Sequence, residues 1–145
     1  MAVRFTRVVA ALITDERGRY LICQRNRRRP MPLKWEFPGG KIEAGETAPK
    51  ALARELREEL GIEAVVAQPA ARLRHSYSDG TRVALLFYRV RQWRGEITNL
   101  VFEDVRWVPV QQLPTYDFLE ADLVLVHQLA APTSQTRATV RSRRA

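Results

Sequence analysis

Residues 40–62 read GKIEAGETAPKALARELREELGI, and this segment constrains the fold more tightly than any other part of the chain. Thr47 is a suitable N-cap for a helix, and Gly61 is a suitable residue to end one in a left-handed conformation. Between them, apolar residues recur at every fourth position, which places them on one helix face; they are Ala48, Leu52, Leu56 and Leu60. The sequence therefore predicts a helix over about residues 47–60 with one side packed against a core.

The same segment contains glutamates beside that apolar stripe. Glu55, Glu58 and Glu59 fall at i, i+3 and i+4, so a helix would place all three carboxylates on one face. Each pair of like charges on such a face destabilises a helix by about 0.2–0.5 kcal/mol. A divalent cation would offset this repulsion, because hard cations such as Mg²⁺ bind carboxylate oxygen. The alternative is an ordinary solvated face, in which Arg54 and Glu58 form a surface pair.

The full spacing of the segment favours the metal-binding interpretation. It fits the pattern G-x5-E-x7-R-E-U-x-E-E-x-G-U, where U is apolar, and an accidental match is on the order of one in 10⁸ per start position. The residues at the defined places are Gly40, Glu46, Arg54, Glu55, Leu56, Glu58, Glu59, Gly61 and Ile62. This pattern resembles the signature of the Nudix hydrolases. Residues 35–46, WEFPGGKIEAGE, are similar to the MutT-like branch, whose members cleave nucleoside triphosphates.

The resemblance covers about residues 4–131 and implies an α/β fold, the Nudix α/β/α sandwich with a mixed central sheet and two main helices. One Nudix domain is expected over residues 1–131, and residues 132–145 are expected to form a basic, disordered tail. Residues 93–99 are predicted to form a loop. The apolar patterns predict a second helix over 119–129 and strands over 4–14, 19–25, 35–38, 62–67, 70–77, 82–90 and 103–110, with 82–90 central.

The resemblance also implies roles for the acidic residues. Glu58 and Glu59 are expected to be the main metal ligands, together with the backbone carbonyl of Gly39. Glu55 is expected to be a further ligand or the general base. A last ligand is expected from a distant loop, where Glu103 is the first choice; a solvated loop acid is the alternative there. The cofactor is expected to be Mg²⁺, with Mn²⁺ as a substitute.

Two basic residues complete the predicted catalytic machinery. Arg54 and Glu46 are similar to the pair that braces the loop against the helix in this family. Lys41 is placed to stabilise charge on the phosphates. The predicted catalytic residues are thus Glu55, Glu58, Arg54 and Lys41, and the predicted metal ligands are Gly39, Glu55, Glu58, Glu59 and Glu103.

A nucleotide pocket is expected next to the metal site. By position in MutT-like enzymes, Arg25, Phe37 and Asp79 resemble pocket residues, although Phe37 also suits a core and Arg25 a surface. Asp122 departs from bacterial MutT, which has an amide at this place; an ionised carboxylate only accepts hydrogen bonds, whereas a protonated one also donates. A helix N-terminal acid is the alternative for Asp122. The predicted substrate-binding residues are Arg25, Glu36, Phe37, Pro38, Gly39, Asp79 and Asp122.

These assignments lead to one main functional hypothesis. The chain is expected to hydrolyse oxidised nucleoside triphosphates, such as 8-oxo-dGTP, to the monophosphate and pyrophosphate. Because Asp122 weakens the case for strict 8-oxoguanine selectivity, a triphosphatase for CTP or modified pyrimidines is the alternative. A non-catalytic nucleotide-binding regulator on the same fold is a further one.

Composition and charge agree with this hypothesis. The formal net charge of +8 favours an anionic partner, either the triphosphate or nucleic acid touched by the basic tail. No apolar run approaches the roughly 18 residues that a membrane span needs. Cys23 is the only cysteine, which excludes an intrachain disulfide and fits a cytoplasmic protein. The sequence leaves monomer and dimer open.

Overall fold

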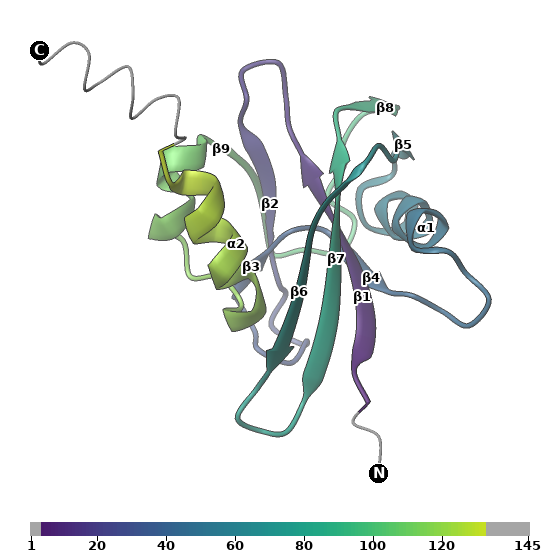
Figure 1. The fold of residues 1–145 in the computed structure, drawn as a ribbon. Helices are drawn as coiled ribbons and strands as arrows, with labels where there is room; N and C mark the ends of the chain where they lie inside the picture. Colours follow the sequence, from purple (N-terminus) through teal and green to yellow (C-terminus); the bar gives the residue numbers. More distant parts are fainter. Residues whose placement is uncertain (1–3, 133–145) are drawn as a thin grey trace, which may run out of the picture.

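A computed structural model describes residues 4–132 of the chain, and the predicted tail at 132–145 lies almost entirely outside the described residues. The elements follow one another as β1 (Thr6–Ile13), β2 (Tyr20–Gln24), β3 (Trp35–Glu36), β4 (Gly39–Lys41), α1 (Ala48–Leu60), β5 (Glu63–Val65), β6 (Pro69–Ser76), β7 (Arg82–Val90), β8 (Gln92–Arg94), β9 (Asp104–Val108), the 3₁₀ helix η1 (Val110–Thr115) and α2 (Glu120–Ala130) (Figure 1).

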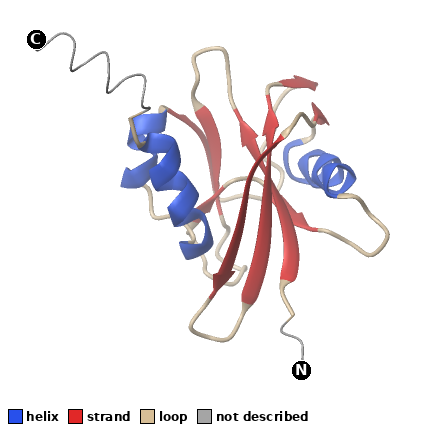
Figure 2. Cartoon of the chain, viewed as in Figure 1, coloured by secondary structure: helices blue, strands red, loops and turns tan. Residues whose placement is uncertain are grey.

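The central sheet has the strand order β4-β1-β7-β6 and mixes both pairing directions. Strands β1 and β7 run parallel over their whole length, whereas β4 and β6 are antiparallel to their neighbours. A second sheet, β3-β2-β9, and the small pair β5-β8 lie beside it. Helices α1 and α2 lie on opposite sides of these strands, which confirms the predicted α/β/α sandwich (Figure 2).

Alternation along β1 explains why both faces of the sheet are covered. Val9, Ala11 and Ile13 belong to the core under α1, whereas Ala10 and Leu12 belong to the core under α2. Successive side chains of a strand point to opposite faces, so the continuous apolar run VVAALI supplies both cores at once. The predicted central place of β7 is confirmed for the same reason, with Leu86 on one side and Phe87 on the other.

Local signals in the sequence define helix α1, as predicted. The Lys50 backbone N–H donates to the Thr47 hydroxyl at 3.4 Å, which makes Thr47 the N-cap. The helix ends at Gly61, whose φ of 67° is the left-handed conformation that glycine tolerates best. Leu52, Leu56 and the other residues of the apolar stripe are buried, and Glu59 beside them is buried as well.

The structure corrects several predicted boundaries. The segment 93–99 is not entirely a loop, because Gln92–Arg94 forms β8 and pairs with β5. The Gly-rich segment after residue 38 is strand β4 rather than a turn. The strand predicted over 103–110 ends at Val108 and leads into η1, which the sequence did not predict.

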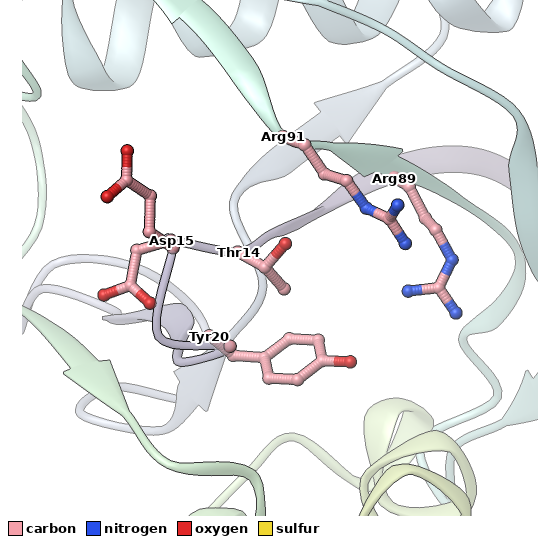
Figure 3. Close-up of a pocket in the computed structure, with 7 residues that line it drawn as sticks. Thr14, Asp15, Tyr20, Arg89 and Arg91 are labelled. Carbon is pink, nitrogen blue, oxygen red and sulfur yellow. The ribbon is translucent and has the colours of Figure 1, made fainter.

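Beyond the end of β1, the turn that follows it and the end of β7 line an open pocket (Figure 3). Gly39 of β4 pairs with Ala10, whereas Thr14 in the pocket lies four residues further along the strand, about 13 Å away. The pocket is therefore separate from the place where β4 pairs with β1. Within residues 4–132, none of the helices is sufficiently long and apolar to cross a membrane.

Candidate active site

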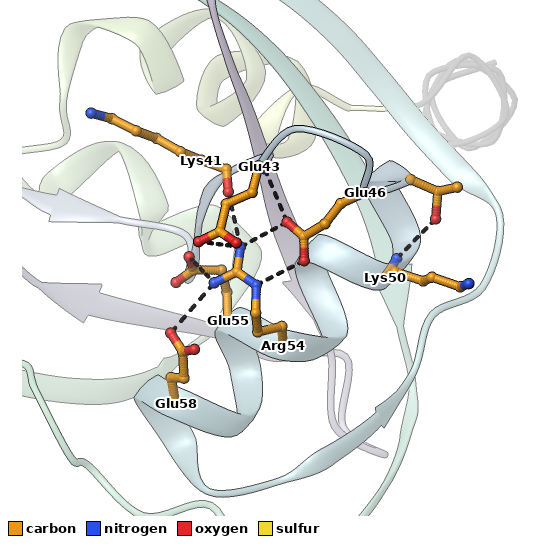
Figure 4. A network of polar contacts seen from close by, with 8 residues as sticks. Lys41, Glu43, Glu46, Lys50, Arg54, Glu55 and Glu58 are labelled. Carbon is orange, nitrogen blue, oxygen red and sulfur yellow. Dashed lines mark hydrogen bonds and ion pairs between the residues drawn. The ribbon is translucent and has the colours of Figure 1, made fainter.

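Arg54 is the centre of a polar network that joins the loop after β4 to α1 (Figure 4). Its Nε and Nη2 donate to the two carboxylate oxygens of Glu46 at 2.8 and 2.9 Å, a bidentate contact. Its Nη2 also donates to the Lys41 backbone carbonyl at 3.2 Å. The hydrogen bonds from Arg54 lower the pKa of Glu46 to about 2, so this carboxylate stays ionised near neutral pH. The geometry is that of the predicted brace between loop and helix.

The same guanidinium reaches two of the predicted metal ligands. Arg54 Nη1 donates to Glu55 at 3.0 Å and lies 3.5 Å from a carboxylate oxygen of Glu58. Glu55 is largely buried, whereas the Glu58 side chain is 59% exposed. Burial raises the pKa of Glu55, and the charge of Glu58 raises it further, against the opposing effect of Arg54.

Glu59 occupies a different environment from its neighbour in the sequence. It is only 7% exposed, and its carboxylate accepts a hydrogen bond of 3.0 Å from the backbone N–H of Gly39. Burial, followed by the negative charges of Glu36 and Glu55, raises the pKa of Glu59 to about 9. The bond from Gly39 brings β4 and the acidic face of α1 together, as the sequence predicted.

Two adjacent glycines permit this close approach. A Cβ at Gly40 would overlap the carboxyl group of Glu55, and a Cβ at Gly39 would overlap the backbone carbonyl of Val9. Larger residues at either place would push the strand away from the helix. The pair Gly39-Gly40 is thus required where the backbone, the helix carboxylates and β1 meet.

The chemistry of these groups fits a divalent cation. Glu55, Glu58 and Glu59 offer hard oxygen donors, and a bound cation would favour the ionised form of Glu59, which burial disfavours. Among residues 4–132, however, no three acidic, histidine or cysteine side chains already form a metal-binding cluster. Arg54 instead lies between Glu46, Glu55 and Glu58. Glu55 and Glu58 therefore share a contact with Arg54, and Glu59 contacts Gly39, but these ligands are not arranged as a finished cage.

A group of buried polar side chains adjoins this acidic site through Glu36. Arg25 Nη1 donates to Glu36 at 2.8 Å, and both side chains are almost fully buried. The second oxygen of Glu36 pairs with Arg29 at 3.4 Å. Glu36 also affects Glu59 on one side and Asp122 on the other through its charge. Burial raises the pKa of Asp122 well above its usual range, and the charge of Glu36 adds to this effect.

The remaining predicted residues lie in varied positions. Phe37 is buried, with its ring 5.4 Å from that of Phe118 and 6.0 Å from that of Phe87 between ring centroids. Pro38 is buried beside it, and its carbonyl accepts from the Ala11 N–H. Phe37 therefore packs in the core, which was the alternative expected for it. Arg25 is not the surface residue that its own alternative described, because it is buried and paired with Glu36.

Lys41, Asp79 and Glu103 lie nearer to solvent. In Figure 4 the Lys41 side chain extends away from Arg54. Asp79 lies in the exposed β6–β7 turn and accepts from the Thr81 N–H at 2.8 Å. Glu103 precedes β9, and its carboxylate lies 3.5 Å from Arg27. In the described part of the chain, no hydrogen bond or ion pair connects these three residues to Glu55, Glu58 or Glu59.

The structure adds two residues that the sequence reasoning did not assign to the site. Arg29 shares Glu36 with Arg25, and the Tyr77 hydroxyl accepts a 3.3 Å hydrogen bond from the Ala121 N–H beside Asp122. The signal for Tyr77 was present in the period of β6, where Leu73 and Tyr77 alternate onto the face under α2. No comparable periodicity marks Arg29, which lies in a loop.

Comparison with known proteins agrees with this geometry. The model of the NUDIX domain matches residues 4–129, and the chain belongs to this family. An 8-oxo-dGTP diphosphatase from Haemophilus influenzae is 35% identical over 92% of this chain and 97% of its own length. A CTP pyrophosphohydrolase from Escherichia coli is 33% identical over 89% of this chain and 94% of its own length.

Solved structures extend the comparison to three dimensions. The solution structure of the E. coli ORF135 protein is 30% identical, with a TM-score of 0.75 over 97% of this chain and 94% of that one. MutT from a study of Aliivibrio salmonicida and Vibrio cholerae is also 30% identical, with a TM-score of 0.72 over 90% of this chain and all of that one. The chain is a Nudix pyrophosphohydrolase of the MutT-like branch.

Proposed function

We propose that this enzyme performs Mg²⁺-dependent hydrolysis of nucleoside triphosphates to the monophosphate and pyrophosphate, with oxidised purine nucleotides such as 8-oxo-dGTP as the first substrate class. The observation that supports this most directly is the Gly39–Glu59 hydrogen bond. It places the acidic face of α1 against β4, and the charge of Glu36 connects this face with the buried side chains of Arg25 and Asp122. In this proposal, the first group cleaves the phosphate and the second recognises the base.

In this proposal, Glu58, Glu59 and the Gly39 carbonyl would hold Mg²⁺ or Mn²⁺, Glu103 would supply a further ligand, and Glu55 would be the general base. Bound Mg²⁺ neutralises phosphate oxygens and lowers the pKa of bound water. Arg54 fixes Glu55 and Glu58 relative to the loop through its contact with Glu46.

The side chains of this chain then have distinct tasks. Glu55 accepts the proton of the attacking water, since its raised pKa makes it a stronger base than an ordinary carboxylate. Lys41 extends from the network into solvent and meets the phosphates. The Glu36–Arg25 pair keeps the residues that recognise the base at a fixed position relative to the acidic site.

Recognition of the base rests on Asp122. A protonated carboxyl group both donates and accepts, so it can pair with the exchanged donor and acceptor pattern of an oxidised purine or with a pyrimidine edge. The relatives named above include both an 8-oxo-dGTP diphosphatase and a CTP pyrophosphohydrolase. Hydrolysis of CTP or modified pyrimidine triphosphates is therefore the second candidate function.

Pyrophosphate release from a panel of nucleotides with Mg²⁺ tests both candidates. We expect Glu59→Gln to lower kcat by about 100-fold or more, since removal of one electrostatic group from such a site typically has that effect. Glu63→Gln on the exposed strand β5 is the matched control and should retain full activity. Full activity of Glu59→Gln would refute the metal-site assignment.

Asp122→Asn separates the two substrate classes. The amide keeps both donor and acceptor but removes ionisation and fixes their positions. We expect the ratio of kcat/KM for 8-oxo-dGTP to that for CTP to change by about tenfold or more, the effect of one hydrogen bond to a base. An unchanged ratio would show that Asp122 does not contact the base.

A further inference from the structure

The pocket beyond the end of β1 is separate from the active site and has a basic side. Its volume is about 490 Å³, and it is lined by Thr14, Asp15, Glu16, Gly18, Tyr20, Arg89 and Arg91. Arg89 and Arg91 are two positions apart, so they continue the face of β7 on which Phe87 lies. In Figure 3 both guanidinium groups lie on the same side of the pocket, across from the labelled Asp15.

The two guanidinium groups have no counter-ion within the described part of the chain. No hydrogen bond or ion pair of residues 4–132 involves either side chain, although Arg89 is half-buried. A partly desolvated cation without a partner is unfavourable, and an anion that enters the pocket would relieve this. The unpaired positive charge therefore points to an anionic ligand.

The acidic residues of the pocket do not neutralise these arginines. Asp15 accepts from Arg19 Nε at 2.7 Å and from the N–H groups of Arg17 and Arg19. These bonds lower the pKa of Asp15 and direct its carboxylate to its own turn. Glu16 is exposed and forms no ion pair among the described residues. It remains the one acid in the pocket whose charge opposes an anion.

The walls of the pocket are fixed by backbone hydrogen bonds. The Thr14 N–H donates to the Val90 carbonyl at 3.2 Å, and Thr14 also bridges to Tyr20. The Arg89 N–H donates to Gln68, and its carbonyl accepts from Ala67, at 3.1 and 3.0 Å. A ligand would therefore meet arginines and hydroxyl groups on a backbone that is already ordered, which reduces the entropy lost on binding.

We propose that this pocket is a second anion-binding site, distinct from the catalytic centre, for a small phosphate-bearing molecule. Arg89 and Arg91 supply forked donors that match phosphate oxygens, and the hydroxyls of Thr14 and Tyr20 supply additional donors. Two positive charges match a phosphate dianion better than a single carboxylate. The shared chemistry is the phosphate group, whether it belongs to free inorganic phosphate or to pyrophosphate.

An NMR titration of the full-length ¹⁵N-labelled protein with inorganic pyrophosphate, in EDTA, tests this site without catalysis. Amide shifts of Thr14, Tyr20, Arg89 and Arg91 should saturate together, separately from any shifts at Gly39. Inorganic phosphate should saturate the same amides, and acetate at equal concentration should not. Shifts confined to Gly39 and its neighbours, or equal saturation by acetate, would overturn the proposal.

Variants with opposite expected signs make the test specific. Arg89→Gln with Arg91→Gln should raise the Kd for pyrophosphate about tenfold or more, which corresponds to about 1.4 kcal/mol. Glu16→Gln should lower the Kd by about twofold, because it removes a repulsive charge. Arg72→Gln is the matched control, since Arg72 alternates onto the opposite face of the sheet, and should change the Kd by less than about twofold. A Kd unaffected by the double substitution would refute the site.

Discussion

Replacement of Glu59 by glutamine should make the metal-free protein more stable at alkaline pH. The carboxyl group is 7% exposed and its pKa is about 9 in the folded state, compared with 4.5 in an unfolded chain. Between these two values the folded protein holds a proton that the unfolded chain has lost. The stability that this group contributes is fully present below pH 4.5, and it is lost as the pH rises through 9.

The size of this effect follows from proton linkage. While the native state binds one more proton than the unfolded state, the free energy of unfolding falls by about 1.4 kcal/mol for each pH unit. Wild-type protein should therefore lose about 3 kcal/mol between pH 6 and pH 8 because of Glu59. In Glu59→Gln the amide oxygen still accepts from the Gly39 N–H, but it does not titrate, so most of this slope should disappear.

Urea unfolding in EDTA at pH 6 and pH 8 measures this difference. Glu58→Gln is the control, because it makes the same chemical change at the neighbouring, exposed position of α1. Addition of Mg²⁺ at pH 8 should stabilise wild type more than Glu59→Gln, since a cation favours the ionised carboxylate. Parallel pH dependences of wild type and Glu59→Gln would refute the assignment of Glu59 as a buried acid without a counter-charge.

Three further substitutions test the brace and the helix. Arg54→Lys should lower the rate of pyrophosphate release about tenfold or more, because lysine cannot contact Glu46 in a bidentate manner and also reach the helix carboxylates. Arg57→Lys, on the same helix, should leave the rate unchanged. Equal rates for the two variants would exclude a bracing role for Arg54. Gly61→Ala should lower the free energy of unfolding by about 1 kcal/mol, because its φ of 67° is strained for alanine, and an unchanged urea midpoint would contradict this. Leu56→Ala should lower the free energy of unfolding by about 2–4 kcal/mol, since the Leu56 side chain on α1 is fully buried in the core. A loss below 1 kcal/mol would show that the core collapses around the cavity.

The helix α1 was predictable because its signals are local. Thr47 caps it, the leucines repeat every fourth residue, and Gly61 ends it, all within one stretch of chain. Strand β8 gave no such signal. Its three residues acquire their conformation by pairing with β5, which lies far away in the sequence. A three-residue strand has too little pattern of its own to be distinguished from a loop.

The site shows the same division between local and distant causes. The resemblance predicted that Arg54 pairs with Glu46 and that Gly39 lies close to Glu59, and the structure shows both contacts. It did not predict that Glu36 lies between Arg25 and the acidic face of α1. Glu36 was among the predicted substrate-binding residues, but its position between Arg25 and Glu59 arises only from where β3 places it.

The sequence by itself determined the acidic helix face and the family resemblance, because residue spacing is a property of neighbouring residues, and that resemblance implied the sandwich of helices around a mixed sheet. Only the tertiary structure decided that Glu59 is buried while Glu58 is exposed, and that Asp122 and Arg25 are both buried and close enough for Arg25 to affect the pKa of Asp122. These properties depend on which surfaces exclude water from a side chain. Water exclusion is set by strands and helices that are distant in sequence, and it raises the pKa of Glu55, Glu59 and Asp122, whereas the contact with Arg54 lowers the pKa of Glu46.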